Sequence, residues 1–263
     1  MPFTLSHAAA ALPFRRLNLV WSAFLVGSMA PDFPYVVGDI KYRALGHNFP
    51  GVVFFTLPAS FAVLWFYHWG IKRPIVGLLP VGVQRRLSGQ LGEFSFGGGR
   101  RMLAITFSIV LGVATHLIWD AFTHSLTWPW LHFAWLRSWI ELPRMGWTPM
   151  TMIMQYGSSL LGLLAVAIWI VLWYRRTAPV EDADLTAPVT SQLPVAVLIL
   201  VIATATGLLH GWMLLGMVPM TIRNLDWFLL NVATTAIAVA FWELLLYCLI
   251  TTSREYTGRL TSA

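Results

Sequence analysis

The sequence has few charged residues and almost no cysteine. Of 263 residues, only 11% are Asp, Glu, Lys or Arg, whereas 57% are hydrophobic. A water-soluble domain carries about 25% charged residues, because its surface must stay hydrated. The composition therefore excludes an ordinary soluble domain and predicts that lipid is the solvent for much of the chain. The single cysteine, Cys248, excludes an internal disulfide and any zinc site built from several cysteines.

The sequence also lacks a basic stretch before its first apolar segment. Arg15 and Arg16 follow Phe3–Phe14 rather than precede it, which argues against a cleaved signal peptide. The formal net charge is +6. A basic chain can bind nucleic acid, but in a membrane protein basic loops usually fix the orientation, so we expect no nucleic-acid partner.

Long apolar runs predict an all-α polytopic integral membrane helical bundle. Each run is close to the about 20 residues that a helix needs to cross a bilayer. A shorter run, Leu17–Ala30, stops at Pro31, which cannot continue a helical hydrogen-bond ladder. It predicts an N-terminal helical hairpin or a short sixth span. The five full spans are expected at Gly51–Trp69, Met102–Phe122, Met150–Trp173, Pro194–Met217 and Trp227–Ile250.

Basic residues are concentrated in alternate loops, which predicts the orientation. If the runs alternate, most arginines and lysines fall on one side, and we place that side and the C-terminus in the cytoplasm. The majority side holds Lys72, Arg73, Arg85, Arg86, Arg100, Arg101, Arg175, Arg176, Arg254 and Arg259. The opposite side keeps Lys41, Arg43, Arg137, Arg144 and Arg223.

Two irregular segments divide the chain. The stretch 178–192 contains proline, threonine and acidic residues and is expected to be a cytoplasmic linker between a membrane domain, 1–177, and a C-terminal pair of transmembrane helices, 193–263. The segment Thr127–Trp147 is rich in tryptophan and too interrupted to span. We expect an amphipathic segment in the membrane interface, acting either as an anchor or as a lid over a site.

Ionisable residues near spanning helices are costly in lipid and are therefore candidates for function. His116, Asp120 and His124 are spaced four apart, so a helix places them along one face. His116 and Asp120 could bind one cation, or could form a structural hydrogen bond between helices. Under the alternating topology, Asp32 and His47 reach the same membrane face. Their convergence favours a metal site over the alternatives of a turn aspartate and an interfacial histidine.

The remaining ionisable residues are less informative. As an α-helix, the about 8 residues between His7 and the turn at Arg15 rise only about 12 Å, against about 20 Å for the second arm of the hairpin. His7 would then reach Asp32 only through tilt or a shallow turn. His68 and His132 are expected to be interfacial. His210 and Glu243 lie inside the last two spans, as a proton relay or as hydrogen-bonding groups within the bundle.

Three strings in the N-terminal part carry a family resemblance, and two of them, MPFTLSH and GSMAPDFPY, are specific. MPFTLSH, GSMAPDFPY and GHNFPG resemble the prokaryotic membrane proteins of domain-of-unknown-function family 4184. That family is in turn similar to predicted membrane-bound metal-dependent hydrolases of the zinc phospholipase C and nuclease type. The resemblance implies a prokaryotic inner-membrane protein with a zinc-type site, whose donors in chain order are His7, Asp32, His47, His116 and Asp120. The soluble enzymes of this type have a later histidine and glutamate that bind further metals, and His124 and Glu141 are the candidates for these positions in this sequence.

These observations lead to a hypothesis and one rival. The hypothesis is a hydrolase that uses a divalent metal, zinc rather than magnesium because of the histidines, on a phosphoester or lipid-like substrate at the non-cytoplasmic surface. Asp120 and His124 are the expected catalytic residues, with His124 orienting a ligand or relaying a proton. The rival is a non-catalytic membrane protein, either a transporter that uses His210 and Glu243 or a partner-binding subunit. The sequence does not indicate an oligomeric state.

Overall fold

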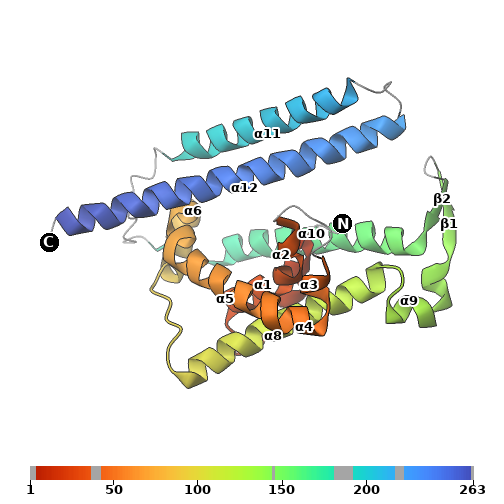
Figure 1. The fold of residues 1–263 in the computed structure, drawn as a ribbon. Helices are drawn as coiled ribbons and strands as arrows, with labels where there is room; N and C mark the ends of the chain where they lie inside the picture. Colours follow the sequence, from red (N-terminus) through yellow and green to blue (C-terminus); the bar gives the residue numbers. More distant parts are fainter. Residues whose placement is uncertain (1–3, 37–42, 144–145, 181–191, 217–221, 262–263) are drawn as a thin grey trace. The chain divides into compact units, whose positions relative to one another are not determined.

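The computed structural model describes residues 4–36, 43–143, 146–180, 192–216 and 222–261, and these are almost entirely helical (Figure 1). The expected all-α polytopic helical bundle is confirmed. Within the described residues, five helical stretches are long and apolar enough to cross a membrane. They are Phe49–Leu78, Gly99–His132, Met150–Arg176, Leu193–Leu215 and Asn231–Arg254.

The chain forms two compact units, and the first contains residues 1–65 and 94–176. Its N-terminal part is built from short helices, and its C-terminal part from two long ones. In chain order these elements are η1 (Thr4–Arg16), α1 (Trp21–Met29), η2 (Ala30–Asp32), α2 (Phe33–Val36), α3 (Arg43–His47), α4 (Phe49–Gly51), η4 (Val52–Thr56), α5 (Leu57–Phe66), α8 (Gly99–Thr123) and α10 (Met150–Arg176).

Helix α1 crosses α8 at close range, and this crossing forms the core of the first unit. A Cβ atom on Gly112 of α8 would collide with the carbonyl oxygen of Phe24 in α1, so only glycine permits this approach. Buried aliphatic side chains surround the crossing and extend to α5. They are Val20, Ala23, Val26, Leu64, Ile105, Ile109 and Val113. The packing fixes the end of α1, which leads into Asp32, against the half of α8 that carries His116 and Asp120.

The N-terminal hairpin is present, but its first arm is a 3₁₀-helix rather than an α-helix. Element η1 packs against α1, α8 and α10. A 3₁₀-helix rises about 2.0 Å per residue, so the nine residues from His7 to Arg16 extend about 18 Å. This length matches the second arm from Trp21 to Asp32, about 17 Å at 1.5 Å per residue. The expectation that the first arm is too short for His7 to reach the level of Asp32 was therefore wrong, because it assumed the smaller rise of an α-helix.

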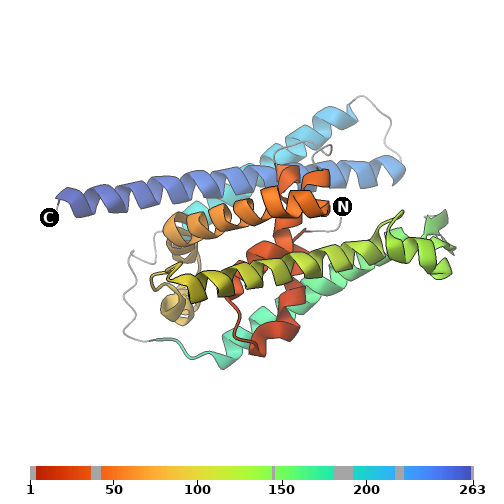
Figure 2. The same ribbon diagram turned by 60° about the horizontal axis from the view of Figure 1, so that its bottom comes forward.

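Between α8 and α10 lies a tryptophan-rich excursion of mixed structure. It comprises α9 (Trp128–His132), η7 (Ala134–Arg137) and an antiparallel hairpin of β1 (Trp139–Leu142) and β2 (Gly146–Pro149), with Glu141 opposite Trp147. Figure 2 shows α8 and α10 running into this excursion together. The sequence predicted a single amphipathic segment, whereas the bulky residues of WIEL and GWTP favour a strand pair. Trp128, Trp139 and Trp147 are all strongly exposed.

The second unit contains residues 66–93 and 177–263. Within it, α11 (Leu193–Leu215) and α12 (Ile222–Thr261) pack side by side along much of their length (Figure 1). The other elements are η5 (Tyr67–Ile71), α6 (Lys72–Leu78), α7 (Val81–Leu87) and η6 (Ser88–Gln90). The functional division into 1–177, 178–192 and 193–263 stays a prediction, and residues 181–191 of its linker lie outside the described residues.

Candidate metal centre

His116 and Asp120 lie on one face of α8, one turn apart, as their spacing predicted. The His116 side chain is fully buried, and Asp120 is 6% exposed. His116 Nδ1 lies 2.8 Å from the carbonyl oxygen of Ser28 at the end of α1. A carbonyl only accepts hydrogen bonds, so Nδ1 carries the proton and donates it. In a neutral ring this leaves the lone pair on Nε2, which faces the carboxylates. Metal-bound histidines are commonly held in this way by a carbonyl on the other nitrogen.

Asp32 ends the 3₁₀ turn that follows α1, and its side chain is held from two directions. The Thr4 hydroxyl donates a hydrogen bond of 2.7 Å to Asp32 Oδ2. The other oxygen, Oδ1, lies 3.6 Å from His116 Nε2. Asp32 is only 6% exposed, so this carboxylate is removed from bulk solvent. An anion in such surroundings requires a cation or several donors to offset the lost hydration.

His47 is the last residue of the short helix α3, which packs directly on the turn that carries Asp32. Gly46 makes this contact possible, because a Cβ at that position would collide with the carbonyl oxygen of Pro31. Asn48 then caps the next helix by accepting the Gly51 N–H at 2.7 Å. These constraints bring His47 Nε2 to 3.2 Å from Asp120 Oδ2.

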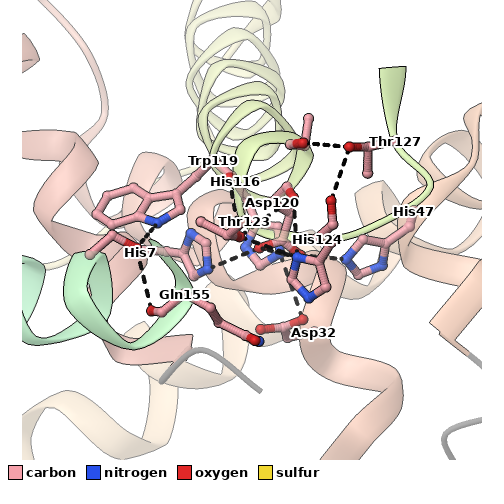
Figure 3. A network of polar contacts seen from close by, with 12 residues as sticks. His7, Asp32, His47, His116, Trp119, Asp120, Thr123, His124, Thr127 and Gln155 are labelled. Carbon is pink, nitrogen blue, oxygen red and sulfur yellow. Dashed lines mark hydrogen bonds and ion pairs between the residues drawn. The ribbon is translucent and has the colours of Figure 1, made fainter. Parts of the chain in front are cut away.

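Asp32, His47, His116 and Asp120 together form a donor group that could hold a metal ion. One ligand atom from each residue lies within 4.8 Å of all the others. His116 Nε2 is 3.6 Å from both Asp32 Oδ1 and Asp120 Oδ2. A tetrahedral zinc site with bonds of about 2.0 Å has ligand atoms about 3.3 Å apart. The observed separations are already close to those of neighbouring ligands on one ion, so this donor set fits a zinc-type site. Figure 3 shows the four side chains converging.

The second oxygen of Asp120 faces two further histidines. His7 Nε2 lies 3.6 Å from Asp120 Oδ1, and His124 Nδ1 lies 3.8 Å from it. Asp120 is therefore the central residue of the cluster, with one oxygen toward His47 and His116 and the other toward His7 and His124. Figure 3 shows this arrangement, with α8 supplying the middle of the network.

His7 enters the cluster from η1 as a fully buried side chain. Its ring stacks on His116, with centroids 4.0 Å apart, and meets Trp119 edge-on at 5.2 Å. Among the described residues, neither ring nitrogen of His7 has a hydrogen-bond partner. Residue 7 lies outside the five candidate spans, and burial, followed by the nearby His116, lowers the pKa of His7 to about 4. The ring is thus neutral at pH 7, the form in which imidazole binds metals.

His124 occupies a different place from the one that a continuous helix would give it. Helix α8 ends at Thr123, and His124 is its C-cap, with an extended backbone. Its Nδ1 lies 3.1 Å from the backbone carbonyl of Asp120 and 3.2 Å from the Thr123 hydroxyl. His124 therefore borders the cluster at the end of the helix instead of extending the donor face by one more turn.

The other candidate residues lie elsewhere within the described part of the chain. His132 is exposed, stacks on Trp128 and bonds to its carbonyl at 2.8 Å. Glu141 is exposed on β1, with no described contact to the cluster. His68 in η5 packs against Tyr67. His210 pairs with the Thr235 hydroxyl at 2.9 Å across α11 and α12, rather than with Glu243.

Two polar residues near the cluster were not anticipated from the sequence. Thr4 orients Asp32, and Gln155 on α10 extends its side chain toward the cluster (Figure 3). Thr4 stands in the MPFTLSH string, but nothing in the string distinguishes it from Ser6. Gln155 could have been identified from the sequence, because a side-chain amide inside an apolar span is unusual and indicates a polar contact.

Fold and cluster together define a class: a multi-spanning membrane protein with a buried His/Asp group that could hold a metal ion. A family model described as "Domain of unknown function (DUF4184)" matches residues 1–249, and the chain belongs to this family. The resemblance of its N-terminal strings is thereby confirmed. No curated protein and no solved structure matches the chain.

Proposed function

We propose that the protein is a membrane-bound, metal-dependent hydrolase that acts on a phosphoester or lipid-like substrate at the non-cytoplasmic surface of a prokaryotic inner membrane. The observation that carries this proposal is the convergence of Asp32, His47, His116 and Asp120, from three separate elements, within 4.8 Å of one another. The similarity to zinc phospholipase C and nuclease enzymes remains part of the proposal.

Electrostatics supports a cation at this position. Asp32 and Asp120 are both nearly buried, and each lies 3.6 Å from His116 Nε2. Two anions at this range repel each other in surroundings of low polarity, and a divalent cation between them removes both the repulsion and the net charge. Two imidazoles among four donors favour zinc over magnesium, which prefers an all-oxygen shell.

A bound divalent ion would supply a water of lowered pKa and would polarise the oxygen of the substrate. The chain's own residues would perform the remaining tasks. Thr4 holds the Asp32 carboxylate, and the Ser28 carbonyl holds the His116 ring, so both donors are oriented before the ion arrives. His7 and His124 face the other oxygen of Asp120. We assign His7 to metal binding and His124 to proton transfer at the edge of the cluster.

The Trp-rich excursion supports a substrate that lies in the membrane. It connects α8, which carries His116 and Asp120, to α10, and it exposes Trp128, Trp139 and Trp147. Tryptophan prefers the boundary between head groups and acyl chains. An excursion held at that boundary would place lipid head groups beside the cluster.

Metal analysis of detergent-purified protein tests this function. Wild-type protein should retain about one zinc per chain, and Asp120→Asn should lose most of it while still inserting into the membrane. Glu141→Gln, which likewise converts a carboxylate to an amide but at an exposed position, is the matched control and should keep its zinc. Zinc-loaded protein should then hydrolyse a generic phosphodiester such as bis(p-nitrophenyl) phosphate. Equal zinc in Asp120→Asn and wild type would remove Asp120 from the site. Zinc binding without hydrolysis of any phosphoester would favour the non-catalytic alternative.

A further inference from the structure

Gln155 lies on the face of α10 that packs inward, and this face is turned toward the metal cluster. The buried positions of this helix are Thr151, Ser159 and Gly162. Gln155 follows Thr151 by four residues, and Ser159 and Gly162 follow it by eight and eleven, so Gln155 falls within the same stripe along one face. A Cβ on Gly162 would meet Ser6 and Trp119, which shows that this face packs on η1 and α8. Figure 3 shows the Gln155 side chain extending from this face toward Asp32 and the histidines.

The backbone carbonyl of Gln155 is held by a hydrogen bond, whereas its side-chain amide is free to bind a ligand. The Ser159 hydroxyl donates to the Gln155 carbonyl at 2.7 Å, and Ser158 accepts a 3.0 Å hydrogen bond from Trp119 Nε1. Trp119 in turn contacts the His7 ring. This chain of contacts holds the start of α10 at the cluster. Within the described part of the chain, the Gln155 side-chain amide makes no hydrogen bond, although it is half-buried.

An amide without a partner is costly in an apolar span. Removing a primary amide from water without a new hydrogen bond costs about 1–3 kcal/mol in proteins. Met152, Ile153 and Met154 precede Gln155 on the helix, and an apolar side chain of that kind would fill the same space without that cost. The half-buried amide faces the metal cluster (Figure 3), where its N–H groups can donate to a bound ligand. The side-chain amide of Gln155 points toward the position that a ligand at the metal cluster would occupy.

We propose that Gln155 is a substrate-binding residue, whose side-chain N–H donates a hydrogen bond to a phosphoryl oxygen of a ligand bound at the Asp32, His47, His116 and Asp120 cluster. This rests on the proposed function and adds a specificity-determining contact. The chemistry of the site favours an oxyanion over a neutral ligand. Two carboxylates and a divalent ion have no net charge, so an added phosphoryl group leaves an anion that an N–H donor stabilises.

Inorganic phosphate is the probe, and its affinity for zinc-loaded, detergent-solubilised protein is measured by isothermal titration calorimetry. Zinc content is measured on the same samples. A hydrogen bond to a charged group contributes enough to stability that its loss lowers affinity about 10-fold or more. Gln155→Leu, which removes the donor, should therefore weaken phosphate binding about 10-fold, with zinc content unchanged. Gln155→Glu should weaken it further, because the new carboxylate repels the anion.

Gln90→Glu provides the matched control, since it adds the same charge at an exposed residue of the second unit and should bind phosphate like wild type. Normal zinc with wild-type phosphate affinity in Gln155→Leu and Gln155→Glu would overturn the role of Gln155 and leave the metal centre intact. A wild-type protein that takes up no zinc would overturn both proposals. If Gln155→Leu fails to fold, Gln155→Glu and Gln155→Asn give the same comparison, with Asn expected to bind weakly because its donor is shorter.

Discussion

The substitution Asp120→Asn should change stability in opposite directions depending on whether metal is present. One carboxylate oxygen of Asp32 and one of Asp120 lie within 4.8 Å of each other, and in chelator no cation would separate them. At an effective dielectric constant of about 20, two unit charges at this distance repel by about 3.5 kcal/mol. Replacing one carboxylate by an amide of the same shape removes that repulsion. In chelator, Asp120→Asn should thus be at least as stable as wild type, and up to about 3 kcal/mol more stable.

With zinc, the order should reverse. A ligand present at 100 times its dissociation constant stabilises the folded state by about 2.7 kcal/mol. At about 2–4 °C per kcal/mol, wild type should gain about 5–10 °C on moving from chelator to zinc. Asp120→Asn, with one anionic ligand removed, should gain little. The melting curves of the two proteins would then exchange order between the two conditions.

The assay is thermal unfolding followed by circular dichroism at pH 8, above the ordinary imidazole pKa of about 6.5, so that protonated histidines do not replace the metal as counter-charge. Glu141→Gln should follow wild type in both conditions. The contrary reading is that His47, His116 and Asp120 form only a structural hydrogen-bond network. That reading requires Asp120→Asn to be less stable by the same amount with chelator and with zinc, and such a result would refute the reasoning.

Three further predictions test the residues that support the cluster. Thr4→Val removes the hydrogen bond to Asp32 Oδ2 and should weaken zinc affinity about 10-fold, as measured by competition with a chromogenic chelator, with the fold unchanged. Gly46→Ala should force α3 away from the carbonyl of Pro31 and weaken zinc binding more strongly than Thr4→Val, in the same assay. Ser158→Ala leaves the Trp119 N–H without its partner and should destabilise the fold by about 1 kcal/mol, seen as a lower melting temperature, while zinc affinity stays within about twofold.

The helical spans could be predicted from the sequence because their signal is local. Mean apolarity over about 20 residues decides whether a segment crosses a membrane, and it requires no knowledge of tertiary contacts. The pairing of His116 with Asp120 was predictable for a similar reason, since a spacing of four in a helix always brings side chains together. Counting spans also predicted that Asp32 and His47 come close to His116 and Asp120, and the structure brings these four residues together.

Other features of the site depend on contacts that the sequence does not encode locally. His7 reaches the cluster because η1, which packs on α1, α8 and α10, is a 3₁₀-helix, and a 3₁₀-helix rises more per residue than an α-helix. His124 leaves the donor face because α8 ends one residue earlier. The hydrogen bond from Thr4 to Asp32 joins residues 28 apart and depends on the arrangement of the whole hairpin.

X-ray absorption at the zinc edge of the loaded, detergent-purified protein tests the central claim most directly. The account predicts a shell of nitrogen and oxygen ligands only, at about 2.0–2.1 Å, with the outer-shell scattering of imidazole. His116→Ala should lose part of that imidazole signal or fail to retain zinc, whereas His132→Ala, at an exposed histidine bonded to Trp128, should leave the spectrum unchanged. A spectrum that is identical in wild type and in His116→Ala would contradict the account.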